Sequence, residues 1–224
     1  MHPIHPTALA GLLAALSTGL PVPLSTPEAG EVARAACGPG ERAEGDAFPA
    51  PRSKPQPGDL VVSEFMSNPA AVPDAQGEWF ELTNTLPWRL DLEGLVISDA
   101  GGDLFGLWNG GQGILVGPGA SVVLGNNPDP GTNGGVAVDF AYTGFVLANT
   151  EDEIRVHTRE GVLLDAVEYG ADGAWPLEAG RSTGLDPGID DPGVNDDPAH
   201  WCAATAPLPG GDSGSPGTPN EPCP

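Results

Sequence analysis

The sequence predicts an all-β protein, built as an antiparallel sandwich or barrel. Gly and Pro supply 33 and 26 of its 224 residues, a density that breaks long helices and favours turns. After the N-terminal region, no window of roughly 11 to 18 residues shows a helical period of apolar residues free of Gly or Pro. Short segments of alternating polarity recur instead, separated by turn residues, as sandwiches and barrels require.

Two strands open this pattern, at residues 60–66 and 78–84. In the second strand, Phe80 and Leu82 share one face of the predicted sheet, and Trp79 lies on the other. One face is therefore expected to pack on a core.

The apolar residues of segment 90–97 change phase at Gly94, which indicates either a β-bulge or two separate strands. A further strand is predicted at 121–124. The clearest alternation in the chain is 153–157, and a short turn after it predicts a hairpin partner over 162–169.

The chain carries 31 acidic and 8 basic residues, for a formal net charge of −23. A surface this negative repels phosphate backbones, so the composition argues against nucleic-acid binding and against anionic lipid surfaces. Polycations, metal ions and neutral polymers remain as partners, and solubility alone also explains such a charge.

Three parts are predicted along the chain. Residues 1–35 resemble an export signal, because the apolar run 8–16 has the length of a signal core and is too short to span a bilayer. No Lys or Arg precedes that run, which is unusual for an export signal. The position of the cleavage site is left undetermined. Residues 36–58 are expected to be a disordered linker. Residues 59–224 form the sandwich, with a loop-rich C-terminal tail that wraps back onto it. The predicted location is outside the cell or in the cell envelope.

The three cysteines are Cys37, Cys202 and Cys223, without any CxxC pair. A disulfide between Cys202 and Cys223 would tie down a C-terminal stretch rich in Pro, Gly and Ser. It would close a loop of 21 residues (223 − 202), which the chain-entropy model values at roughly 3 kcal/mol. Such a bond persists only in an oxidising compartment.

A series of short motifs in a fixed order resembles the lamin tail domain, as found in exported bacterial proteins. The motifs, in chain order, are VVSEFM, GEWFELTN, LDLEGLVISD, VGPGASVVL, FVLANTEDEIRVHTREGVLLDAVEYG, GRS, the late Trp201 and GSPGTPN. The resemblance covers residues 59–220, most of the chain after the linker.

The resemblance implies an immunoglobulin-like antiparallel β-sandwich that is not an enzyme. It also implies a binding or scaffolding role, with a protein or an extracellular polymer as the unidentified partner and with no resident cofactor. The chromatin contacts of nuclear lamins do not transfer, because the charge here has the wrong sign.

Most recurrent residues of the pattern have a structural explanation. Asn84 ends a strand and is expected to form an Asx turn. Glu64 and Glu81 lie inside strands, so each is either a buried structural carboxylate, held by an Arg or by backbone N–H groups, or a ligand-binding group.

The string Gly211-Asp212-Ser213-Gly214-Ser215-Pro216 is close to the nucleophile motif of trypsin-like proteases. A hydrolase that uses Ser213 is the remote alternative. The spacing argues against it, since His157 and His200 precede Ser213 by only 56 and 13 residues. A turn rich in Gly, Asp and Ser produces the same string by chance.

An acidic stretch near the C-terminus offers hard oxygen ligands that suit Ca²⁺. The alternative function it raises is a Ca²⁺-stabilised surface adhesion protein, and the competing explanation is a solvated acidic loop. The candidate ligands are Asp186, Asp190, Asp191, Asn195, Asp196 and Asp197.

Tryptophan is frequent for a chain with 6% aromatic residues. Surface tryptophans stack on sugars or anchor protein interfaces. Trp79, Trp88 and Trp108 are the candidate ligand contacts, whereas Trp175 and Trp201 are expected to pack under the tail.

Overall fold

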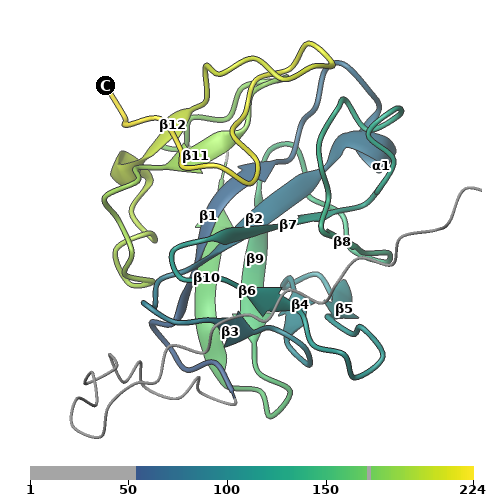
Figure 1. The fold of residues 1–224 in the computed structure, drawn as a ribbon. Helices are drawn as coiled ribbons and strands as arrows, with labels where there is room; N and C mark the ends of the chain where they lie inside the picture. Colours follow the sequence, from purple (N-terminus) through teal and green to yellow (C-terminus); the bar gives the residue numbers. More distant parts are fainter. Residues whose placement is uncertain (1–53, 171–172) are drawn as a thin grey trace, which may run out of the picture. The chain divides into compact units, whose positions relative to one another are not determined.

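A computed structural model describes residues 54–170 and 173–224. These residues form twelve strands, one short α-helix and one 3-10 helix (Figure 1). The strands are β1 (Leu60–Met66), β2 (Trp79–Asn84), β3 (Leu90–Asp91), β4 (Val96–Ser98), β5 (Leu104–Gly106), β6 (Leu115–Val116), β7 (Ser121–Gly125), β8 (Phe140–Ala141), β9 (Asp152–His157), β10 (Leu163–Tyr169), β11 (Thr183–Leu185) and β12 (Trp201–Ala203). The helices are α1 (Asp74–Gly77) and η1 (Pro198–His200).

The strands form two main sheets. One has six strands in the order β12-β11-β1-β2-β7-β8, and the other has four in the order β10-β9-β4-β5. All neighbours pair antiparallel except β7 and β8, and β3 pairs with β6 in a small third sheet. The predicted all-β, immunoglobulin-like sandwich is confirmed.

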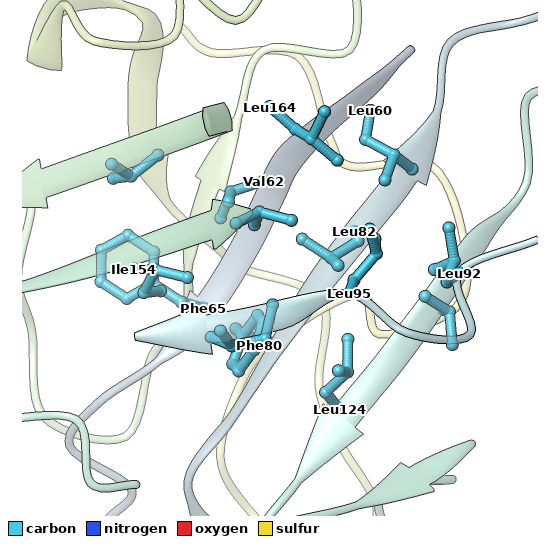
Figure 2. Packing of buried hydrophobic residues seen from close by; sticks show 14 of the residues in the cluster. Leu60, Val62, Phe65, Phe80, Leu82, Leu92, Leu95, Leu124, Ile154 and Leu164 are labelled. Carbon is cyan, nitrogen blue, oxygen red and sulfur yellow. The ribbon is translucent and has the colours of Figure 1, made fainter. Parts of the chain in front are cut away.

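The core lies between the two main sheets (Figure 2). Phe80 and Leu82 of β2 are fully buried in it, as the alternation of polar and apolar residues requires. Ile154 of β9 and Leu164 of β10 come from the opposite sheet. Burying each such side chain stabilises the fold by about 1.5–3 kcal/mol, so this layer supplies most of the stability.

A buried carboxylate joins the two sheets. The β1 ladder shifts register between Val62 and Glu64, and the β10 ladder shifts between Leu163 and Asp165. Asp165 Oδ2 accepts the backbone N–H of Val62 at 2.6 Å and the side-chain amide of Asn195 at 2.9 Å. The bulge in each sheet lies beside one of the two bonded groups, the N–H of Val62 and the carboxylate of Asp165, which join across the sandwich.

The change of phase at Gly94 separates two strands in different sheets, which was one of its two predicted explanations. Gly94 has a φ of +90°, and its N–H donates to the carbonyl of Leu107. The turn lets β3 and β4 leave in different directions, because glycine adopts a positive φ without a steric cost.

The predicted linker extends a few residues too far. Gln56 N donates to Asp59 Oδ2 at 2.8 Å, and Thr85 Oγ1 donates to the carbonyl of Gly58 at 2.6 Å. Residues 54–58 therefore belong to the folded domain. The predicted export signal, the rest of the linker and Cys37 lie outside the described residues.

Candidate functional site

The C-terminal tail covers the outer face of the six-stranded sheet. Trp79, on that face of β2, forms a second apolar cluster with Met66, Val123 and Val136, and Leu208 of the tail packs against it. Trp79 is only 2% exposed. Its prediction as a ligand contact is wrong, because the face opposite the core is covered by the tail rather than by solvent.

Glu64 fastens this tail from the middle of β1. Its Oε1 accepts the hydroxyl of Ser182 at 2.5 Å and the backbone N–H of Ser215 at 2.8 Å, and its Oε2 lies 3.0 Å from Ser215 Oγ. Burial raises the pKa of Glu64 to about 7, against the lowering effect of these hydrogen bonds. The carboxyl is thus a structural group held by hydroxyl and backbone N–H donors.

Glu81 fastens the tail from the neighbouring strand β2. Its Oε1 accepts the hydroxyl of Ser63 at 2.6 Å, and its Oε2 accepts the backbone N–H of Gly217 at 2.7 Å. Burial raises its pKa, although both of these bonds lower it. Glu64 and Glu81 therefore satisfy the structural explanation predicted for them, through hydroxyl and backbone N–H groups.

Asp212 and Ser213 belong to the same attachment. Both carboxylate oxygens of Asp212 accept the backbone N–H groups of Ala70 and Ala71, at 3.0–3.2 Å. The backbone of Ser213 bonds to Gly180 and Ser182. His200 Nδ1 lies 2.8 Å from the carbonyl of Val194. The protease-like string is therefore a loop that attaches the tail to the domain through Asp212 and Ser213.

The disulfide is formed as predicted, between Cys202 of β12 and Cys223 near the C-terminus, with the Cα atoms 5.6 Å apart. It holds the end of the tail beside the edge strand of the six-stranded sheet (Figure 1).

The acidic loop does not assemble the predicted calcium site. Asp186, Asp191 and Asp197 each accept a backbone N–H two residues further on, at 2.9–3.0 Å, in Asx turns. Asn195 is fully buried beside Asp165, while Asp190 and Asp196 are exposed. In the part of the chain that the structure describes, no three His, Cys, Asp or Glu side chains gather as metal ligands.

A cavity of about 290 Å³ opens where the tail ends on the six-stranded sheet. Its floor is made by outward-facing residues of three strands, and its walls by the segments 185–189 and 217–220. The floor residues include Ser63, Thr83 and Ser121. No signal in the sequence pointed to this cavity, since it forms only when five separate segments of the chain meet.

The outer face of the four-stranded sheet is the second candidate surface. Leu104 and Trp108 are 62% and 63% exposed, and Leu163 is 47% exposed. Pairing places Leu163, His157, Val96 and Gly106 in one row across the strands. Leu104 pairs with Ser98 in the next row of the same face, and Trp108 follows the end of β5 by two residues.

The other predicted tryptophans divide as follows. Trp108 is exposed, and its role as a ligand contact stays a prediction. Trp88 is half-buried, and its Nε1 has no hydrogen-bond partner among the described residues. Trp175 and Trp201 pack with Phe65, at ring-centroid distances of 6.3 and 5.7 Å.

The lamin tail domain matches residues 53–171, which is 119 of the 224 residues. The chain belongs to the lamin tail domain family. A search of curated proteins finds no match. None of the helices in residues 54–170 and 173–224 is long and apolar enough to cross a membrane.

The lamin tail domain match ends at the start of the tail, yet the tail completes this domain. Strands β11 and β12 lie beyond the matched residues and extend the six-stranded sheet from the edge of β1. The family is one of immunoglobulin-like, non-enzymatic domains, so the two surfaces are best considered as binding surfaces.

Proposed function

We propose that this protein is an exported, non-catalytic binding and scaffolding module that contacts a protein or a polymer at the cell surface or outside the cell. The observation that carries the proposal is the exposure of Leu104 and Leu163 on the two edge strands of the four-stranded sheet, and of Trp108 just after β5.

The two sheets differ in what covers them. The tail buries Trp79 and Val123 on the outer face of the six-stranded sheet, whereas Leu104 and Trp108 on the other sheet stay accessible among the described residues. An exposed apolar patch with a polar rim is typical of an interaction site. Trp supplies a large contact area and is enriched among residues that dominate binding energy.

Gly106 leaves a low spot on this face of the sheet. It lies between Leu104 and Trp108 and carries no side chain, and a Cβ placed there would approach only the backbone carbonyl of Leu95, at 3.9 Å. Gly106 pairs with Val96, and the two form a low floor beside the large side chain of Leu104. Such a floor suits an extended segment or a flat sugar ring, and the exposed Trp108 close by in the sequence offers a stacking surface.

Polar groups lie on β9, between the two edge strands of this face. His157 is next to Val96 in the row, and Arg155 pairs with Glu168 at 2.6 Å on the neighbouring row. Burial and the nearby Arg155 lower the pKa of His157. The imidazole is therefore a neutral hydrogen-bonding group at pH 7, beside an apolar floor.

Export is supported by the N-terminal apolar run and by the disulfide. A bond between Cys202 and Cys223 is expected to persist in an oxidising compartment and not in a reducing cytosol.

The proposal is tested by comparing immobilised wild-type chain with a Leu104→Ser/Trp108→Ser variant. Both are incubated with protein and polysaccharide fractions from the envelope of the producing organism. Wild type should retain a component that the variant loses by at least about tenfold, equal to 1.4 kcal/mol.

The matched control is Val146→Ser, in the loop between β8 and β9, where Val146 is 57% exposed. It should bind as wild type does. Equal retention by all three chains would show that the four-stranded sheet is not the contact surface.

A further inference from the structure

The cavity at the end of the tail has a floor built from a chain of hydroxyl groups. Thr83 Oγ1 donates to Ser63 Oγ at 2.7 Å, and Ser63 Oγ donates to Glu81 at 2.6 Å. Ser121 Oγ lies 2.8 Å from Thr83 Oγ1. The side chain of Ser121 also hydrogen-bonds to Glu81, so all three hydroxyl groups belong to one network around this carboxyl.

This chain of donors is directed towards the carboxyl group of Glu81. Each hydroxyl proton is therefore directed inward or sideways, and spare lone pairs of Ser121 and Thr83 remain for a ligand. The carboxylate of Asp186 also lines the cavity. Its two oxygens accept the N–H groups of Gly188 and Cys223, one each, and keep further capacity as acceptors. The polar lining thus offers these acceptors to a donor, beside Thr218 and Asn220, whose own donors are already paired within the domain.

Another part of the lining is apolar, and the lining contains no Lys, Arg or His. Leu185, Pro187, Ile189 and Pro219 form one side, and Val61 lies at the floor. A volume of about 290 Å³ is at the lower end of the range for ligand pockets, roughly 300–1,000 Å³. It suits a side chain or a small molecule.

We propose that this cavity binds a primary alkylammonium group, with the ammonium on the floor of hydroxyl and carboxylate acceptors and the methylene stem against the apolar walls. An ammonium offers three donors and no acceptor, which complements this lining. The net charge of −23 also raises the local concentration of cations. The site lies on the other sheet from the proposed contact face and does not depend on it.

The test uses the full chain at about pH 8, since burial raises the pKa of Glu81 and the higher pH favours its carboxylate. Nα-acetyl-lysine methylamide is titrated and followed by NMR shifts of residues 119–121 and 217–220. Saturable shifts are expected. Nα-acetyl-norleucine methylamide, which keeps the stem and lacks the charge, should bind at least about tenfold more weakly.

Thr83→Val keeps the shape and β-propensity of the side chain and removes its oxygen. It should weaken binding of the lysine probe about tenfold, because a hydrogen bond to a charged group is lost. The control is Thr150→Val, at an exposed position that does not line the cavity. No saturable shifts, equal binding of the norleucine probe, or equal effects of the two variants would each overturn the proposal.

Two sources could supply the ammonium, a lysine of a partner protein or a free aliphatic amine. Binding of the peptide Gly-Gly-Lys-Gly-Gly is compared with binding of 1,4-diaminobutane under the same conditions. Tighter binding of the peptide would indicate a protein partner, and tighter binding of the diamine would indicate a free amine.

Discussion

Ser215 Oγ lies 3.0 Å from Glu64 Oε2, and the same hydroxyl lies 2.8 Å from Asn220 Oδ1. The amide of Asn220 is oriented by its Nδ2, which donates to the carbonyls of Ser63 and Leu185 at 2.7 and 2.9 Å. Its Oδ1 must therefore accept the only hydroxyl proton of Ser215. A proton on Glu64 would fill its contact with Ser215, so this geometry favours the neutral form of the carboxyl.

This geometry predicts how stability depends on pH. Burial raises the pKa of Glu64 from 4.5 to about 7, and likewise raises that of Asp165 from 3.8 to about 7. The folded state binds more protons than the unfolded state between these pKa values. The stability that these two carboxyl groups contribute is therefore present near pH 4.5 and is lost as pH rises through 7. For Glu64 the loss by pH 8 is on the order of 3 kcal/mol. Thermal unfolding should give a higher Tm at pH 5 than at pH 8.

Glu64→Gln isolates the contribution of this carboxyl. The amide NH₂ can donate to Ser215 where the protonated carboxyl does, and the amide oxygen keeps the bonds from Ser182 and Ser215. The variant should match wild type at pH 5 and exceed its Tm at pH 8. Glu151→Gln, at an exposed loop position, should change neither value. A variant that is less stable than wild type at both pH values would show that Glu64 is ionised in the fold.

Ser213 and Ser215 provide a matched pair of substitutions. The hydroxyl of Ser215 bridges Glu64 and Asn220, whereas Ser213 serves through its backbone. Ser215→Ala should cost about 1–2 kcal/mol in denaturant unfolding, and Ser213→Ala less than about 0.5 kcal/mol. A fluorophosphonate probe should label neither serine. Labelling that disappears in Ser213→Ala would revive the hydrolase hypothesis.

The disulfide contributes through the loop that it closes. Cys223→Ser opens a loop of 21 residues, and the chain-entropy model predicts a loss of roughly 3 kcal/mol in the free energy of unfolding. Near-UV circular dichroism should still show a folded core, because other bonds keep the tail attached. Glu64 and Glu81 bond to the tail from the sheet, and Asp212 of the tail bonds to Ala71. A fully unfolded variant would show that these carboxyl contacts depend on the disulfide.

Calcium should have no effect on stability. Among residues 54–170 and 173–224, no three His, Cys, Asp or Glu side chains gather as metal ligands. The Tm in millimolar Ca²⁺ and in excess chelator should agree within about 1 °C, because a ligand stabilises only a state that binds it. A clear rise of Tm in Ca²⁺ would favour the calcium-stabilised adhesion protein instead.

The long strands could be predicted because their side chains alternate. Strands β1, β2, β7, β9 and β10 match the predicted segments within about two residues. The strands of two or three residues, such as β5 and β8, are too short for a period to appear. Their positions are set by pairing with distant segments, which a local pattern does not record.

In the candidate site too, local features could be predicted and features set by distant segments could not. Cys202 and Cys223 could be paired from composition and loop length, and Asn84 forms its expected Asx turn, with Oδ1 accepting the N–H of Leu86 at 3.0 Å. Trp79 was misplaced because alternation identifies the face opposite the core without showing what covers that face. The tail that covers it comes more than a hundred residues later.

The most direct test of the binding role places a photo-reactive benzoylphenylalanine at position 108 in the full chain. The chain is irradiated in the envelope fraction of the producing organism, and position 150 serves as the control. We predict a discrete crosslinked product from position 108 that position 150 does not give. Crosslinking that is absent at 108, or the same from both positions, would contradict the assignment of the exposed sheet face as the contact surface.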